Sequence, residues 1–190
     1  MTADTDAERF AGPEEFRAWL AENHASSPGI WVALAKKGTG AGTVGYDEAL
    51  QVALTWGWID GQARRLDDSH YLQRFTPRRP RSPWSLRNRG FAEALIEAGE
   101  MTPSGLAEVE RARADGRWEK AYGGRRTAEA HPEFVAALER SPAAADFYAT
   151  LSSQNRFAIY YRIQEAKRDD TRARRIEKFV AMLERGEKLY

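Results

Sequence analysis

Hydrophobic residues recur at two spacings in the first half of the chain. Phe16, Trp19 and Leu20 fall at the spacing of one helix face and predict an amphipathic helix. Ile30 and Val32 alternate with other side chains, as in a strand that buries one face. The two spacings predict, in chain order, a helix at residues 14–23, a strand at 30–36, a helix at 46–56 and strands at 58–65 and 70–76. The first half is therefore predicted to follow the order α-β-α-β-β.

Three prolines separate this half from a second half, in which the hydrophobic residues follow helical spacing throughout. Pro77, Pro80 and Pro83 have no backbone donor and disfavour helix in the residue before each, which predicts a rigid loop. Beyond the loop, helical spacing, capping residues and glycines predict helices at 86–98, 103–114, 132–139, 142–151, 153–167 and 172–185. The predicted fold class is therefore α+β, a small α-β-α-β-β unit followed by a helical half.

The length of 190 residues suits one domain or a small domain with a helical extension. We expect an α+β unit at residues 10–122, a linker at 123–131, a helical region at 132–190 that packs on the first unit, and a disordered tail at 1–9. No hydrophobic run approaches the roughly 20 residues of a membrane-spanning helix. The polar N-terminus lacks the pattern of a secretory signal. A soluble, cytoplasmic protein without membrane contact is therefore expected.

Arginine is concentrated in one stretch, although the net charge is only +1. From Arg64 to Arg89 the sequence has eight arginines, no lysine and two acids. A guanidinium matches pairs of phosphate or carboxylate oxygens, so the exclusive use of arginine favours a recognition site for an anion. The alternative is a solvated loop, or pairing with acids elsewhere in the chain. The arginines predicted to bind a ligand are Arg64, Arg74, Arg78, Arg79 and Arg81.

Aromatic and polar residues beside these arginines complete the predicted site. Trp58 and Trp84 are expected to line a pocket and to stack on a planar ligand. Tyr71 and Gln73 alternate along one predicted strand and share a face, which is either the binding face or the solvent face. Two further tryptophans are expected in the core, since aromatic side chains dominate burial energetics. They are Trp31 and Trp56.

Asp60 and His70 are the candidates for acid–base chemistry. Asp60 interrupts an apolar strand, where a carboxylate needs water or a partner, and an ion pair with Arg64 or Arg74 is the alternative to catalysis. Histidine is the side chain suited to carry a proton near neutral pH, which makes His70 a candidate, but an exposed histidine is also ordinary at a turn. The three histidines lack metal-ligand spacing, and the chain has no cysteine and no phosphate-binding GxxxxGK[ST] string. We therefore expect no metal and no cofactor.

Three strings of the sequence resemble the signatures of a known family. They are GWIDG at residues 57–61, QRFTPRRPRSPWS at 73–85 and ARRIEKF at 173–179. These strings are similar to those of YdeI/OmpD-associated (OmdA-like) proteins, also described as bacteriocin-protection proteins, over about residues 16–186. The resemblance implies a YjbR-like α+β fold for the first half, a fold for which DNA binding is suggested. It carries over no catalytic residue.

These observations support three hypotheses of function. The first is binding of an anionic small molecule or a nucleic acid through the arginine-rich loop. The second is a small cofactor-free enzyme in which Asp60 or His70 is the acid or base and the arginines hold the substrate. The third is a stress or bacteriocin-protection factor that acts through contacts with a protein partner. Substrate, oligomeric state and pathway are not indicated by the sequence.

Overall fold

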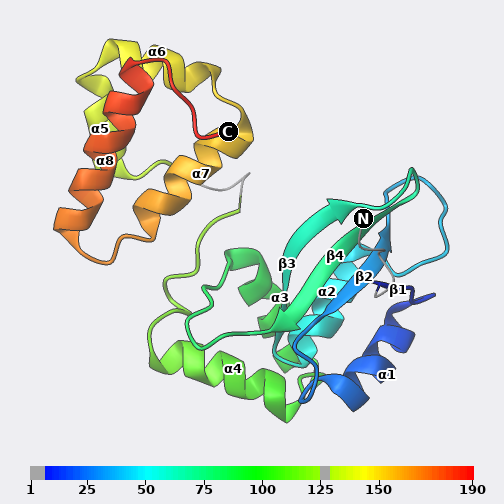
Figure 1. Cartoon of the computed structure of the whole chain (residues 1–190). Helices are drawn as coiled ribbons and strands as arrows, with labels where there is room; N and C mark the ends of the chain where they lie inside the picture. The colour runs from blue at the N-terminus through cyan, green and yellow to red at the C-terminus, as the bar shows by residue number, and fades with distance from the viewer. Residues whose placement is uncertain (1–6, 125–128) are drawn as a thin grey trace. The chain divides into compact units, whose positions relative to one another are not determined.

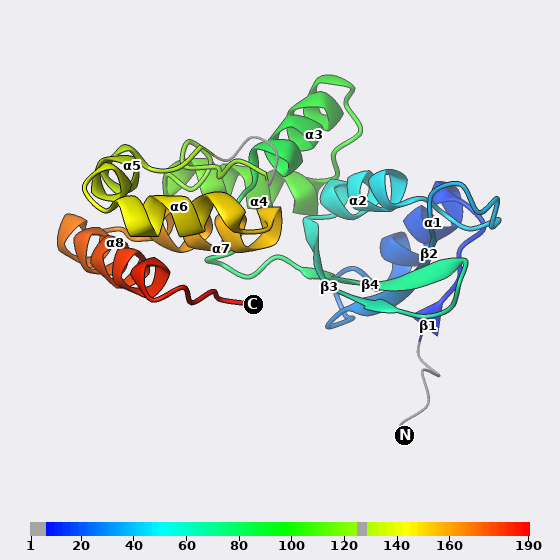
Figure 2. The ribbon, with the colours of Figure 1, turned by 90° about the horizontal axis from the view of Figure 1, so that it is seen from above.

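The structure is a computed structural model and describes residues 7–124 and 129–190. Figures 1 and 2 show a mixed sheet with helices in one part and helices alone in the other. The predicted α+β class is confirmed. The described chain divides into an N-terminal unit and a C-terminal unit. Residues 7–84 and 88–121 contribute to the first, and residues 85–87, 122–124 and 129–190 to the second.

The N-terminal unit is built on a four-stranded sheet with the order β1-β2-β4-β3. Strand β1 (Ala7–Glu8) runs parallel to β2 (Ile30–Ala35), while β3 (Trp58–Arg65) and β2 both run antiparallel to β4 (His70–Pro77). The three longer strands match their predicted ranges to within one residue. Strand β1 was not predicted, because two residues give no alternation to detect; it lies in the expected tail, whose residues 1–6 are outside the described part.

Helices α1 (Pro13–Asn23) and α2 (Tyr46–Thr55) cover one face of this sheet (Figure 2). Phe16 and Leu20 of α1 are fully buried, as the helical spacing predicts. They pack with apolar residues of α2 and with alternate residues of the strands in one cluster, whose central members are Ile30, Val32, Leu34, Ala49, Val52, Ala53, Trp58 and Phe75. The face of the sheet that bears these side chains is called the helix-covered face below.

Helices α3 (Leu86–Glu97) and α4 (Pro103–Ala114) add a second apolar cluster to this unit, which includes Trp84 and Trp118. Thr102 starts α4 by accepting a hydrogen bond from the backbone of Gly105. Its hydroxyl also donates to the carbonyl of Thr55, 2.7 Å away, at the end of α2. The start of α4 is thereby joined to α2.

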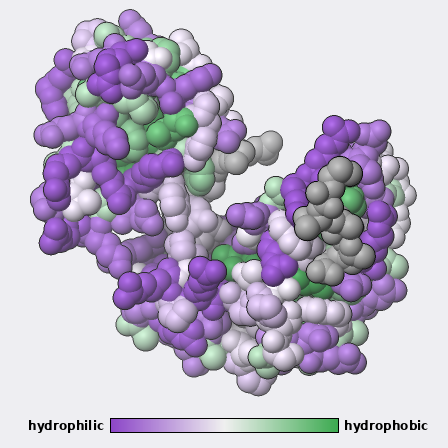
Figure 3. Space-filling model, viewed as in Figure 1, coloured by the Kyte–Doolittle hydropathy of each residue, from purple (hydrophilic) through white to green (hydrophobic). Residues whose placement is uncertain are grey.

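The C-terminal unit has a hydrophobic core of its own, formed by α5 (Pro132–Glu139), α6 (Pro142–Thr150), α7 (Ser153–Gln164) and α8 (Asp169–Glu184). These helices match their predicted ranges to within three residues at each end. Figure 3 shows hydrophobic side chains in the middle of the visible face of this unit and hydrophilic ones around them. The buried cluster shared by these four helices supports an independently packed helical unit.

Two features are absent from the described residues. None of the helices within residues 7–124 and 129–190 is both long and apolar enough to cross a bilayer. In the same residues, no three metal-ligating side chains come together. The expected linker at residues 123–131 includes residues 125–128, which lie outside the described part.

Candidate anion-binding surface of the N-terminal unit

The strand register places two of the predicted arginines on the face of the sheet opposite α1 and α2. Trp31 pairs with Arg74, and Leu72 pairs with both Ala33 and Arg64. Paired residues in neighbouring strands point to the same side. Trp31, Arg64, Leu72 and Arg74 therefore share one side, called the arginine face here.

Trp31 lies against both guanidinium groups of the arginine face. The Cζ atoms of Arg64 and Arg74 are 4.1 and 5.7 Å from the centroid of its ring. Strand β4 lies between the strands of Trp31 and Arg64, so these two side chains meet above β4, where Leu72 is fully buried. A cation over an indole face is attracted by the ring quadrupole. The arginine face therefore carries a stacked Trp–Arg cluster.

A β-bulge in β3 decides on which face Arg64 lies. Asp60 pairs with Phe75 and Ala63 pairs with Gln73, so β3 has one more residue than β4 between these pairs. Without the bulge, Asp60 and Arg64 would point to the same side, since they are four residues apart. The extra residue leaves Asp60 on the helix-covered face and turns Arg64 to the arginine face.

Gln73 holds this bulge with its side-chain amide. Its Nε2 atom donates to the carbonyl oxygens of Gly61 and Gln62, at 3.0 and 3.2 Å. The side chain is only 4% exposed and points to the helix-covered face. Tyr71 shares that face, as predicted, and packs against the core cluster. That Tyr71 and Gln73 contact a ligand remains a prediction. In the structure, both side chains pack on the helix-covered face of the sheet.

Asp60 has a hydroxyl partner in place of the expected arginine. Its Oδ2 atom accepts a hydrogen bond from the Tyr46 hydroxyl, at 2.8 Å, which links β3 to α2. Among the described residues it forms no ion pair with Arg64 or Arg74. The expected ion pair is wrong because both arginines lie on the other face of the sheet. A bond from a neutral hydroxyl satisfies this half-buried carboxylate instead.

His70 lies beside the turn between β3 and β4, where its Nδ1 atom is 3.2 Å from Oδ1 of Asp67. Asp67 also accepts hydrogen bonds from the backbone amides of Ser69 and His70. Desolvation acts to raise the pKa of the Asp67 carboxyl, but these amides and the His70 ring together hold that pKa below its ordinary value. His70 and Asp60 lie at opposite ends of their strand pair, so they do not form one site.

Arg78 is a buried residue of the proline-bearing loop. Its Cζ atom lies 3.5 Å from the centroid of the Trp84 ring, and its Nη1 atom donates to the carbonyl of Pro83 at 3.2 Å. Arg78 is 5% exposed and Trp84 is 2% exposed. The loop folds back on itself, so these two predicted ligand residues contact each other. Their assignment to a ligand remains a prediction, and their present contacts stabilise the loop.

The burial of the tryptophans differs in part from the expected one. Trp58 is buried in the first core cluster, where its Nε1 donates to the carbonyl of His24, and Trp84 is buried in the second. Trp31 and Trp56, expected in the core, are both partly exposed. The alternation of β2 indicates the exposure of Trp31, because Trp31 directly follows the buried Ile30 and its side chain therefore points to the other face of the sheet.

Arg79 and Arg81 are exposed at the tip of the same loop. A turn orients this tip, since the Arg79 amide donates to the Ser82 hydroxyl and the Ser82 amide donates to the Arg79 carbonyl. In the described part of the chain, no carboxylate forms an ion pair with Arg74, Arg79 or Arg81.

Two families have models that match this chain. Residues 8–108, more than half of the chain, match a domain of unknown function, DUF8412. Residues 127–186 match the OmdA model, described as bacteriocin-protection, YdeI or OmpD-associated. Searches of curated proteins and of solved structures return no match. The expected YjbR-like topology of the N-terminal unit thus remains a prediction.

The family resemblance is confirmed, over a shorter range than expected. Residues 173–179 lie within the OmdA match, whereas 57–61 and 73–85 lie within the DUF8412 match. The arginine-rich stretch is therefore part of the first domain. The chain belongs to the DUF8412 family, whose model matches residues 8–108, and its residues 127–186 are similar to the bacteriocin-protection, YdeI or OmpD-associated (OmdA) model.

Proposed function

We propose that the N-terminal unit binds a phosphate-bearing ligand on the arginine face and the adjoining loop tip. The observation that carries this proposal is the lack of ion pairs between Arg74, Arg79 or Arg81 and any carboxylate of the described residues. Like charges in one stretch repel each other, and a bound anion relieves that repulsion. Guanidinium groups also present paired donors that fit phosphate oxygens.

The stacked Trp–Arg cluster favours a ligand that has a planar group beside its phosphate. Trp31 is partly exposed and lies 4.1 Å from the Cζ atom of Arg64. Nucleobases stack on tryptophan rings and on guanidinium planes. A nucleotide combines such a base with a phosphate. The ligand chemistry we propose is therefore that of a nucleotide, either free or within a single-stranded nucleic acid.

Binding of a mononucleotide and of a single-stranded oligonucleotide tests the proposal, at about 50 and 200 mM salt. The triple variant Arg74→Ala, Arg79→Ala, Arg81→Ala is compared with a control that loses the same charge from the C-terminal unit. The control carries Arg140→Ala, Lys178→Ala and Lys188→Ala, all at exposed positions. We expect the first variant to bind about tenfold more weakly or worse, and the control to bind within about twofold of the wild type.

The salt series distinguishes the two sources of the ligand. Binding to a single strand weakens with salt at a log–log slope of about −0.7 for each neutralised phosphate. If the mononucleotide binds as tightly as the oligonucleotide, and its affinity depends only weakly on salt, the ligand is a free nucleotide. Equal losses in the test and control variants would instead indicate a general charge effect and would overturn the proposal, as would the absence of binding by the wild type.

A contact with a protein partner is the second candidate function, and the family match carries it. The OmdA model is described as bacteriocin-protection and covers most of the C-terminal unit. Survival of a bacteriocin-sensitive strain that expresses the chain tests this candidate. Protection that persists with the triple arginine variant would assign it to a protein contact. Loss of protection in that variant alone would connect it with the arginine face.

A further inference from the structure

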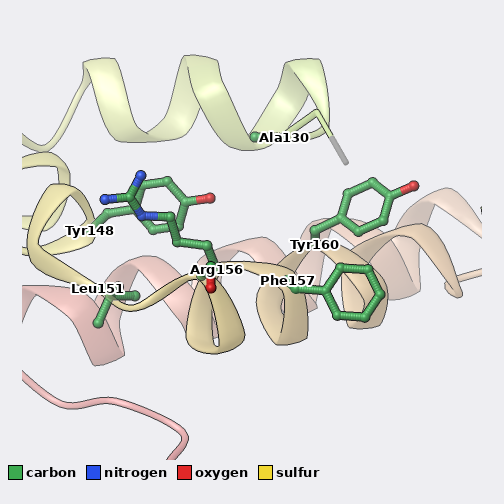
Figure 4. A pocket seen from close by; sticks show the side chains of 7 residues that line it. Ala130, Tyr148, Leu151, Arg156, Phe157 and Tyr160 are labelled. Carbon is green, nitrogen blue, oxygen red and sulfur yellow. The ribbon is translucent and has the colours of Figure 1, made fainter. Parts of the chain in front are cut away.

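A cavity in the C-terminal unit has a volume of about 450 Å³. It lies along the start of α7, beside the end of α6 and the residue Ala130 that precedes α5 (Figure 4). This volume is in the range of small-molecule sites. The residues that line it are Ala130, Tyr148, Leu151, Ser153, Arg156, Phe157 and Tyr160.

One end of the cavity carries an oriented positive charge. The Arg156 guanidinium lies against the Tyr148 ring, with Cζ 5.7 Å from the ring centroid, and both point into the cavity (Figure 4). The Nη2 atom of Arg156 donates to the carbonyl of Ala149. These two contacts fix the plane of the guanidinium and leave its other N–H groups for a ligand.

Among the described residues, no acid balances this charge. The lining residues include neither Asp nor Glu, and Arg156 forms no ion pair with a carboxylate of the described chain. Burial raises the pKa of Tyr148, although the charge of Arg156 acts to lower it, so the phenol keeps its proton and remains a donor. The cavity thus presents donors to one anionic group.

Two aromatic rings form the other end. Phe157 and Tyr160 have ring centroids 5.9 Å apart. In Figure 4 both rings lie to the right of Arg156, on the side away from Tyr148. The Tyr160 hydroxyl accepts a hydrogen bond from the Gly123 amide at 3.0 Å, which fixes this ring. Aromatic rings held in this way offer faces and edges to a planar apolar group.

We propose that this cavity binds a planar aromatic carboxylate. The carboxylate lies on Arg156 and the Tyr148 hydroxyl, because a planar guanidinium matches a carboxylate with two parallel hydrogen bonds. The aromatic part lies against Phe157 and Tyr160. A monoanion fits better than a phosphate dianion, because Arg156 is the single charged residue among the lining side chains. This inference is independent of the proposed nucleotide site.

Calorimetric titration of the full chain with 2-naphthoate tests the inference. The uncharged 2-naphthalenemethanol and acetate are the comparison probes, since each has only one of the two features. We expect 2-naphthoate to bind at least roughly tenfold more tightly than either. Equal binding of the alcohol and the acid, or the absence of 2-naphthoate binding, would overturn the proposal.

Three variants locate the binding. Arg156→Gln is expected to weaken 2-naphthoate about tenfold, and Tyr148→Phe, which keeps the ring, to weaken it about threefold. Arg140→Gln is the control, because Arg140 is exposed in the same unit and does not line the cavity. A melting temperature close to that of the wild type establishes that each variant is folded. Unchanged affinity in folded Arg156→Gln would contradict the assignment.

Discussion

The side-chain amide of Gln73 donates a hydrogen bond to the backbone carbonyl of Gly61, 3.0 Å away. With its second bond, to the carbonyl of Gln62, this contact holds the bulge that turns Arg64 to the same face as Trp31. A buried residue on one side of the sheet thereby determines which charge appears on the other. The proposed nucleotide surface depends on this relationship.

Replacing Gln73 by Met should weaken both the fold and the Trp–Arg cluster. Two carbonyls lose their donor, and we expect the free energy of unfolding to fall by about 1–3 kcal/mol, measured by urea denaturation. The control is Gln62→Met, since the Gln62 side chain is exposed on β3, the strand that contains the bulge. If the two variants were equally stable, the amide of Gln73 would not hold the bulge.

The fold was predictable from local spacing, whereas the site depended on a feature that the spacing hides. The positions of Phe16 and Leu20 alone indicate which side of α1 is buried, and the structure buries both. A bulge adds one residue without a distinct sequence pattern, and here it separates Asp60 from Arg64, which a regular strand would place on one side. The burial of Arg78 was also hidden, because it arises from a loop that returns to Trp84.

Arg78 and Arg79 are adjacent arginines, of which the first is buried and the second is exposed. Arg78→Ala removes a buried guanidinium from the face of Trp84, and we expect a loss of about 2 kcal/mol in unfolding free energy. Arg78→Lys should recover only part of this, since an ammonium has no plane to stack. Arg79→Ala should stay within about 0.5 kcal/mol of the wild type. Equal effects of the two alanine variants in thermal denaturation would refute the structural role of Arg78.

Gly105 is predicted to tolerate no side chain. A Cβ atom there would lie 2.3 Å from the carbonyl oxygen of Thr55, where α4 approaches α2. Gly105→Ala should therefore lower the unfolding free energy by about 1–3 kcal/mol. Gly90 is the matched control, because it is also helical and a Cβ atom there meets nothing within 4 Å. Gly90→Ala should be neutral or stabilising by up to about 1 kcal/mol, so the two changes differ in sign.

The Asp67 carboxylate should make the stability of the β3–β4 turn depend on pH. Its pKa lies below the ordinary value of 3.8 in the folded chain. The stabilisation is thus fully present above pH 3.8 and is lost as the pH falls through the folded-state pKa. Titration of the Asp67 carboxyl carbon by NMR should give a pKa below 3.8, and His70→Ala should move that pKa upward. A pKa above 3.8 would contradict the hydrogen-bonded turn.

Asn155 of α7 should fix residues 189–190 against the C-terminal unit. Its Oδ1 atom accepts from the amides of Leu189 and Tyr190, at 3.1 and 3.0 Å, and its Nδ2 atom donates to the Tyr190 carbonyl at 3.2 Å. The side chain is buried, so Asn155→Leu, of similar size, leaves these backbone groups without their partner. We expect a loss of about 1–3 kcal/mol in unfolding free energy.

Hydrogen exchange separates this local role of Asn155 from a general loss of stability. The amides of Leu189 and Tyr190 should exchange faster in Asn155→Leu, while amides in the middle of α8 change only as far as global stability falls. Gln164→Leu is the control on the same helix, since Gln164 is exposed. The Arg162 guanidinium lies over the ring of Tyr190. Unchanged exchange at Leu189 in Asn155→Leu would mean that this contact, and not Asn155, holds the segment.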